Sequence, residues 1–164
     1  NDSPLVVVAH PHPQHGGTMD SKVVYCLARE LSALGLPVAR FNFRGVGASQ
    51  GDYAEGVGEA EDMVAVVDWM RSKYPRRPIW LAGFSFGGYI AARISIECAA
   101  HHLLLVAPAV DQLIAPEAAK HWSEQQRGSI SFEQVAEADH FFHGKLNELR
   151  QLISTYGQSW LESA

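Results

Sequence analysis

The chain has 164 residues, of which 47% are hydrophobic and 19% are charged, and its formal net charge is -5. This length and composition favour one soluble globular domain that spans residues 1–164. The acidic balance argues against a nucleic-acid-binding surface, and no apolar run approaches the roughly 18 residues of a membrane span. Neither nucleic acid nor a membrane is therefore an expected partner.

The N-terminal stretch and the cysteines favour a cytoplasmic location. The stretch NDSPLVVVAHPHP lacks the basic region and the long apolar core of a signal peptide. Cys26 and Cys98 are isolated in sequence and have no spacing typical of a metal or redox pair. Two such cysteines fit reduced thiols in a cytoplasm.

Apolar runs alternate with helical patterns along the chain. The patterns predict strands at 4–10, 38–43, 78–84, 102–108 and 129–136, and helices at 19–35, 59–74, about 87–98, 116–126 and 145–161. Within helix 59–74 the pattern places Val64, Val67, Trp69 and Met70 inside. The strand runs are mostly continuous, which is typical of strands covered on both faces. We therefore predict a doubly wound, mostly parallel α/β sheet with helices on both faces, and ligands bind beyond the carboxyl ends of such strands.

Ser85, in the stretch GFSFGG, directly follows the third predicted strand, and a helix rich in small residues follows it. A sharp strand-to-helix turn flanked by Gly83 and Gly87 would lift the oxygen of Ser85 above the sheet, as a nucleophile requires. Three fixed positions arise by chance in roughly one chain in twenty of this length, so the motif needs partners. The alternative is a serine that only fills space.

A serine hydroxyl is a poor nucleophile unless a base removes its proton. Among the eight histidines, His140 follows the last predicted strand and is expected at the same sheet edge as Ser85. His143 is expected to be a supporting or packing residue, whereas His101 and His102 begin a strand and belong to the far edge. His140 is therefore the predicted base.

The base needs a carboxylate that holds its tautomer and stabilises its cation. Asp111 lies just past the fourth predicted strand, at the functional edge of the sheet. Asp139 is next to His140, but neighbours in an extended chain point to opposite sides. The order Ser85, Asp111, His140 is the order found in hydrolases with a nucleophile elbow.

The oxyanion that develops during acyl transfer needs two N–H donors. One is expected from Phe86, directly after the nucleophile, and the other from the loop HPHPQHGGTMD after the first strand. The prolines of this loop have no N–H, which leaves His12 and Gln14, and we favour His12. Further residues are expected to line or support the site, and these are His10, Gly16, Gly17, Arg44, Phe141 and His143.

Cofactor sites are weakly indicated. His10, His12 and His15 are closely spaced, but the carboxylates and the second histidine cluster of a zinc site are missing. The stretch RGVGASQG has its third glycine one position late for a dinucleotide-binding loop, and the helix that should follow is delayed. We expect neither a metal nor an organic cofactor.

Four motifs occur in order and cover most of the chain: AHPHPQHGGTMDSKVVY, FNFRGVGASQGDY, GFSFGG and DHFFHGKLNELR. With them the chain resembles the α/β-hydrolase superfamily, and in particular its small, lidless, dienelactone-hydrolase-like group of bacterial proteins. The resemblance implies an esterase-type fold without a cap domain. It also implies that Ser85, Asp111 and His140 act as nucleophile, acid and base.

The chain departs from the family pattern at two places. The family begins with extra strands before the one predicted at 4–10, and it carries an apolar strand directly before the acid. Here VAPAV leads directly into DQLIAPEAAKHW. Deleting a buried strand would leave backbone hydrogen bonds unpaired, so we expect a strand-sized segment between Val110 and Asp111 to be missing from the printed sequence rather than from the protein.

Together these features predict a serine hydrolase, of the carboxylesterase or thioesterase type, that acts on a small acyl ester or thioester. The alternative is a non-catalytic protein of the same fold that serves as a binding or scaffold module. Cleavage of amides or peptides by the same residues also stays open. The C-terminal pattern fits a docked helix or a contact in a homodimer.

Overall fold

The computed structural model describes residues 2–107, 138–139 and 142–163. Within this part of the chain, four parallel strands form a sheet in the order β2-β1-β3-β4. The strands are β1 (Leu5–Ala9), β2 (Val38–Arg40), β3 (Ile79–Phe84) and β4 (His102–Val106), and the helices are η1 (Pro13–His15), α1 (Lys22–Ala33), α2 (Val57–Lys73), α3 (Phe86–Ile94) and α5 (Leu146–Glu162). The predicted helix 116–126 and strand 129–136 lie outside the described residues.

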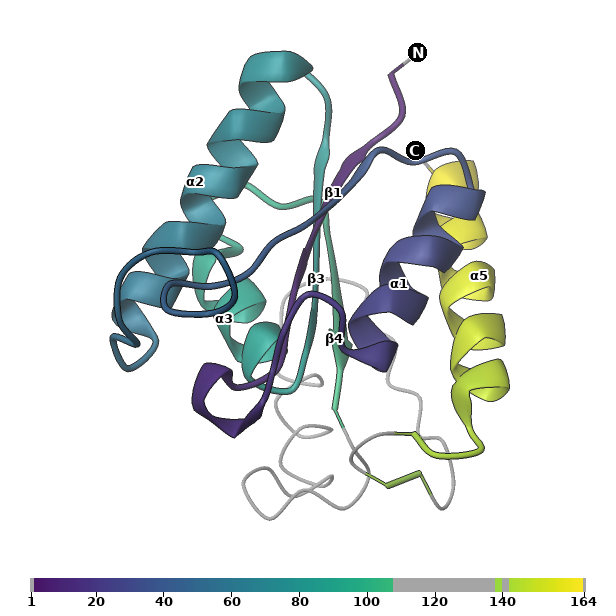
Figure 1. Ribbon diagram of the computed structural model, residues 1–164. Coiled ribbons are helices and arrows are strands. Elements are labelled where there is room, and N and C mark those ends of the chain that lie inside the picture. Colours follow the sequence, from purple (N-terminus) through teal and green to yellow (C-terminus); the bar gives the residue numbers. More distant parts are fainter. Residues whose placement is uncertain (1, 108–137, 140–141, 164) are drawn as a thin grey trace.

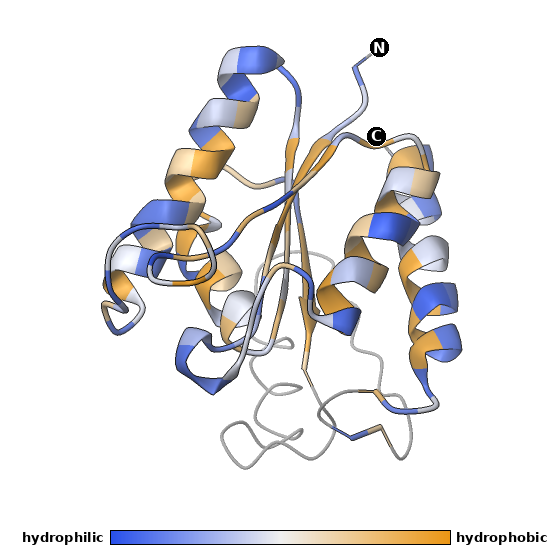
Figure 2. Cartoon of the chain, viewed as in Figure 1, coloured by the Kyte–Doolittle hydropathy of each residue, from blue (hydrophilic) through white to orange (hydrophobic). Residues whose placement is uncertain are grey.

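Helices cover both faces of the sheet, with α1 and α5 on one face and α2 and α3 on the other (Figure 1). Alternate residues of a strand point to opposite faces. In β1, Val6 and Val8 therefore belong to the core under α1 and α5, whereas Leu5, Val7 and Ala9 belong to the core under α2 and α3. Figure 2 shows the apolar sides of these helices turned toward the sheet. The predicted doubly wound α/β fold is confirmed, and burial on both faces explains the continuous apolar runs.

The predicted inner face of α2 was wrong at one residue. Trp69 is 53% exposed, whereas Val67 and Met70 are buried and Val64 is partly buried. Met63, Val67 and Met70 are spaced by four and three residues and therefore lie on one face of the helix. Trp69 is two positions from Val67, about 200° around the helix axis, and so it projects to solvent.

The second strand is shorter than predicted, since β2 ends at Arg40 rather than at residue 43. The backbone N–H of Phe43 donates a hydrogen bond of 3.0 Å to Nε2 of His10, a side chain that follows β1. A side chain therefore replaces the neighbouring strand as hydrogen-bond partner, and the ladder between β1 and β2 stops early. This exchange occurs at the carboxyl edge of the sheet, the same edge at which Ser85 lies.

Candidate functional site

Ser85 lies between β3 and α3 at the carboxyl edge of the sheet and is partly exposed. Its backbone has φ 54° and ψ -120°, a region that residues other than glycine rarely occupy. The surrounding backbone holds this conformation: the Ser85 N–H donates to the Val106 carbonyl (2.9 Å), and the Ser85 carbonyl accepts from the Tyr89 N–H (3.1 Å). Ser85 therefore has the strained strand-to-helix turn of a nucleophile elbow.

The glycines on either side of Ser85 allow α3 to approach the sheet closely. A Cβ atom on Gly83 would lie 2.3 Å from the carbonyl carbon and oxygen of Gly87. A Cβ atom on Gly87 would lie 2.4 Å from the carbonyl oxygen of Ala9 and 2.6 Å from that of His10. These neighbours are backbone atoms, so no side chain fits at either position without displacing a strand end.

The loop after β1 folds back on itself beside the elbow. His12 caps η1: its Nδ1 accepts a hydrogen bond from the Gln14 N–H (3.1 Å), and its carbonyl accepts from the N–H groups of His15 and Gly17. Gly16 ends η1 with φ 78°, and a Cβ on Gly17 would meet the Pro11 carbonyl. Gly16 and Gly17, which were expected to line or support the site, therefore permit the tight fold of this loop.

The two expected oxyanion donors come from neighbouring segments. The rings of His12 and Phe86 pack against each other, with centroids 4.9 Å apart. Phe86 is the first residue of α3, where a helix leaves its N–H groups without an intrahelical partner. Within the part of the chain that the structure describes, the N–H groups of His12 and Phe86 have no hydrogen-bond acceptor. The two residues expected to supply the oxyanion donors therefore pack against each other, and one of them directly follows Ser85.

His10 is completely buried and joins two loops of the site. Its Nδ1 lies 2.6 Å from the Pro11 carbonyl, and its Nε2 accepts the hydrogen bond from the Phe43 N–H. These partners assign the neutral tautomer with the proton on Nδ1. Burial lowers the pKa of His10, which favours the same neutral form. His10 therefore supports the loops after β1 and β2 and does not line a substrate surface.

The buried imidazole predicts a loss of stability in mild acid. Because the pKa of His10 is lowered in the folded protein, the unfolded chain takes up the proton first as the pH falls below about 6.5. The free energy of unfolding should then decrease with falling pH, by at most about 1.4 kcal/mol per pH unit from this group. Urea unfolding at several pH values measures the slope. A His10→Gln variant keeps an acceptor for Phe43 but does not titrate, so an equally steep slope in that variant would contradict the assignment.

Arg44 holds the loop after β2 on α2. Its guanidinium donates to both carboxylate oxygens of Asp62, and its backbone N–H donates to the same carboxylate (2.9 Å). A further hydrogen bond of 3.2 Å reaches Glu61. Ser49 adds a hydrogen bond of 2.8 Å to the Asn42 carbonyl within the loop. Arg44 therefore supports the loop after β2 through its bonds to α2.

Two residues beside the site were missed from the sequence. Glu59 is fully buried, and its carboxylate accepts hydrogen bonds from the N–H groups of Ala54 (2.8 Å) and Gly56 (2.7 Å). These bonds fix the turn that carries Tyr53, whose ring lies 5.0 Å from that of His12. Glu59 lies three residues after the N-cap of α2, the position of a capping-box glutamate, but that N-cap is Gly56, so the side-chain half of the usual sequence signature is lacking. No comparable local signal marks Tyr53.

Near the C-terminus, the predicted residues Asp111, His140 and Phe141 lie outside the described residues, as does the junction before Asp111. Among their described neighbours, Nδ1 of His143 lies 2.6 Å from Oδ2 of Asp139, and the His143 N–H donates to Oδ1 (2.9 Å). The buried Phe142 ring contacts the ring of Phe84, with centroids 6.2 Å apart. Phe142 therefore packs against Phe84, the residue directly before Ser85.

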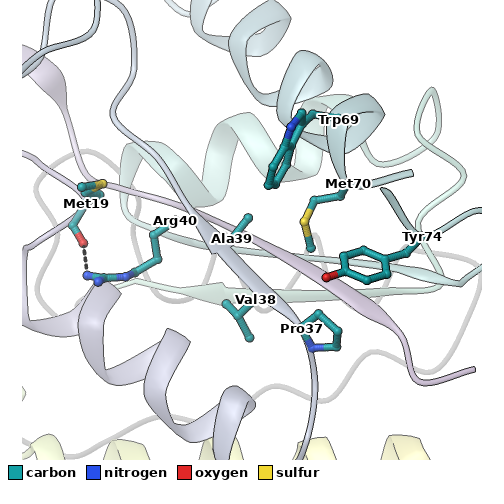
Figure 3. A pocket seen from close by; sticks show the side chains of 8 residues that line it. All are labelled: Met19, Pro37, Val38, Ala39, Arg40, Trp69, Met70 and Tyr74. Atoms are coloured by element: carbon teal, nitrogen blue, oxygen red, sulfur yellow. Dashed lines mark hydrogen bonds between the residues drawn. The ribbon is translucent and has the colours of Figure 1, made fainter. Parts of the chain in front are cut away.

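A groove of about 490 Å³ lies away from Ser85, along the edge strand β2 (Figure 3). Aliphatic, aromatic and methionine side chains form most of its lining, including the exposed Trp69. Its one charged lining residue, Arg40, donates to the Met19 carbonyl (2.7 Å). None of its described lining residues is a serine, cysteine or threonine, so we do not assign the reaction to this groove. The eight lining residues are Met19, Pro37, Val38, Ala39, Arg40, Trp69, Met70 and Tyr74.

The described ranges contain neither a metal-binding cluster nor a membrane-spanning helix. No three histidine, cysteine, aspartate or glutamate side chains there are grouped so that they could hold a metal ion. In the cluster of histidines after β1, the rings of His12 and His15 stack with centroids 4.4 Å apart, and both nitrogens of His10 have backbone partners. No helix among these residues is long and apolar enough to cross a membrane.

Comparisons with known proteins agree with this geometry. The family model described as serine aminopeptidase, S33, matches residues 6–149. The structure of an alpha-beta serine hydrolase homologue from Coxiella burnetii is 40% identical, with a TM-score of 0.84, and the match covers 93% of this chain and 84% of that one. A serine hydrolase without lid from Xanthomonas campestris is 32% identical, with a TM-score of 0.87 and coverage of 98% and 84%. Human monoglyceride lipase is 32% identical over 120 residues, which are 70% of this chain and 37% of the lipase.

Proposed function

Since the chain belongs to the α/β serine hydrolases, in the group without a lid, we propose that it cleaves a small acyl ester or thioester with Ser85 as nucleophile. The observation that carries this proposal is the backbone of Ser85. A strained serine with φ 54° is held at the carboxyl edge of a parallel sheet, beside the N–H groups of His12 and Phe86, which have no acceptor among the described residues. Such strain persists only where the surrounding structure holds it, and it is typical of reactive residues.

In the proposed reaction, His140 removes the hydroxyl proton of Ser85 as Oγ attacks the carbonyl carbon of the substrate. The N–H groups of Phe86 and His12 stabilise the oxyanion, and Asp111 stabilises the imidazolium. His140 then gives its proton to the departing alcohol or thiol, which leaves an acyl group on Ser85. Water attacks this acyl-enzyme with His140 again as base, and the acid departs while Ser85 regains its proton.

The choice of a small ester rests on the relatives. Monoglyceride lipase is by its name an enzyme of ester substrates, and the Xanthomonas relative is described as having no lid. A site without a lid, as described for that relative, would offer little surface to enclose a long lipid chain, which favours small acyl groups. The aminopeptidase description of the family model favours amide cleavage as the second candidate. Hydrolysis of aminoacyl anilides at rates above those for simple esters would select this second candidate.

Labelling with a fluorophosphonate tests the nucleophile directly. The wild-type protein is expected to take up one phosphonyl group, found by mass spectrometry on the peptide that contains Ser85. The Ser85→Ala variant should take up none. A Ser95→Ala variant is the matched control, because Ser95 lies at the other end of α3 and donates to the Ala92 carbonyl. A folded wild-type protein that is not labelled would contradict the proposed enzyme and favour a binding module.

A further inference from the structure

Three aromatic rings from three segments of the chain meet beside Ser85. His12 belongs to the loop after β1, Tyr53 to the loop after β2, and Phe86 directly follows Ser85. The ring of His12 lies 5.0 Å from that of Tyr53 and 4.9 Å from that of Phe86, and Tyr53 and Phe86 lie 6.1 Å apart. All three residues are partly exposed. We call this cluster of His12, Tyr53 and Phe86 the aromatic wall.

The aromatic wall is anchored in the core. The Phe43 ring, which is fully buried, meets the Phe86 ring edge-on at 5.7 Å, and the His10 ring packs edge-on against Phe43 at 4.6 Å. On the other side, the buried Glu59 carboxylate accepts hydrogen bonds from the N–H groups of Ala54 and Gly56, in the turn that follows Tyr53. A wall held from both sides can present fixed ring surfaces to a ligand at little entropic cost.

The rings of the wall are uncharged near neutral pH. Burial and the negative charges of Glu59 and Glu55 raise the pKa of Tyr53, which keeps its phenol protonated. Burial and the neighbouring His15 lower the pKa of His12, although Glu59 acts in the opposite direction. A neutral aromatic surface offers ring contacts to a flat π-system and offers no ion pair to a charged group.

We propose that the aromatic wall binds a flat, unsaturated group of the substrate near the scissile carbonyl, so that esters that carry a phenyl group react faster than cyclohexyl esters of nearly equal size. The inference rests on the proposed function, because His12 and Phe86 are also the expected oxyanion donors. A carbonyl held by their N–H groups has its substituents within reach of their rings. Tyr53 takes no part in the chemistry and is the specificity-determining residue of the wall.

Two matched pairs of esters test the inference on both sides of the carbonyl. Methyl phenylacetate is compared with methyl cyclohexylacetate, and benzyl acetate with cyclohexylmethyl acetate. We expect the ester with the phenyl group to have the higher kcat/KM in at least one pair, and we call the quotient of the two kcat/KM values the phenyl-to-cyclohexyl ratio. In the Tyr53→Leu variant this ratio should fall by about 3- to 10-fold, the range of aromatic pair energies. The Tyr53→Phe variant keeps the ring and should keep the ratio.

The Tyr25→Leu variant is the control, because Tyr25 is a 51% exposed tyrosine on α1, outside the wall. It should retain the wild-type ratio in both pairs. Unchanged ratios in Tyr53→Leu for both pairs would overturn the inference even where the esterase activity is intact. If the wild-type protein hydrolyses none of the esters, the proposed function fails, and calorimetric binding of the same esters to Ser85→Ala decides the inference alone. Equal affinities for the phenyl and cyclohexyl esters would then overturn the inference. Tighter binding of the phenyl esters that is lost in the double variant Ser85→Ala/Tyr53→Leu would support it.

Discussion

Replacing Ser85 with alanine is expected to lower kcat/KM for acyl esters by about 10⁴- to 10⁶-fold, the range seen when the nucleophile of a catalytic triad is removed. No neighbouring group can replace the hydroxyl in forming the acyl intermediate. Alanine keeps the Cβ atom, so the backbone strain at φ 54° and the burial around the elbow stay the same. The free energy of unfolding should therefore change by less than about 1 kcal/mol.

Steady-state hydrolysis of a short acyl ester, together with urea unfolding, measures both effects. The Ser95→Ala variant removes a hydroxyl that only donates to the Ala92 carbonyl at the end of α3, and it should keep its catalytic rate. A Ser85→Ala variant with more than a tenth of the wild-type rate would show that another residue is the nucleophile. Asp111 and His140 stay predictions of the sequence, and their alanine variants test them in the same assay.

Replacing Gly87 with alanine is expected to cost at least about 3 kcal/mol of folding stability and to reduce hydrolysis strongly. The new Cβ would lie 2.4 Å from the Ala9 carbonyl oxygen and 2.6 Å from that of His10. Both atoms belong to the backbone at the end of β1, which no rotamer change can move aside. Either α3 or the loop that carries His12 must shift, and each shift displaces an expected oxyanion donor.

Gly88→Ala, one residue further along α3, is the matched control. There the nearest atom to a new Cβ is the Gly83 carbonyl oxygen at 3.3 Å, and the next are at 3.7 Å. The gain in helix propensity, about 1 kcal/mol, offsets this mild contact, so stability should change little. Urea unfolding and ester hydrolysis of the two variants give the comparison. Equal losses in both variants would show that the close approach of α3 to β1 does not determine stability here.

The fold could be predicted from the sequence because burial on two faces leaves a local pattern. Continuous apolar runs between amphipathic helices indicate a parallel sheet, and the strands from Leu5, Val38, Ile79 and His102 confirm it. The ends of elements were less predictable. The last three residues of the strand predicted at 38–43 fall outside β2, because Phe43 bonds to the side chain of His10. Such an exchange depends on a residue 33 positions away and leaves no periodic signal.

By itself, the sequence determined the doubly wound sheet and the serine between two glycines. Both are local properties, set by apolar spacing and by backbone that leaves no room for a Cβ. Only the tertiary structure decided that the neutral His10 is buried between two loops and that Arg44 bonds to Asp62. It also decided that Tyr53 joins His12 and Phe86 in one wall. The physical reason is that each of these roles depends on partners from segments that are far apart in the chain and that packing brings together.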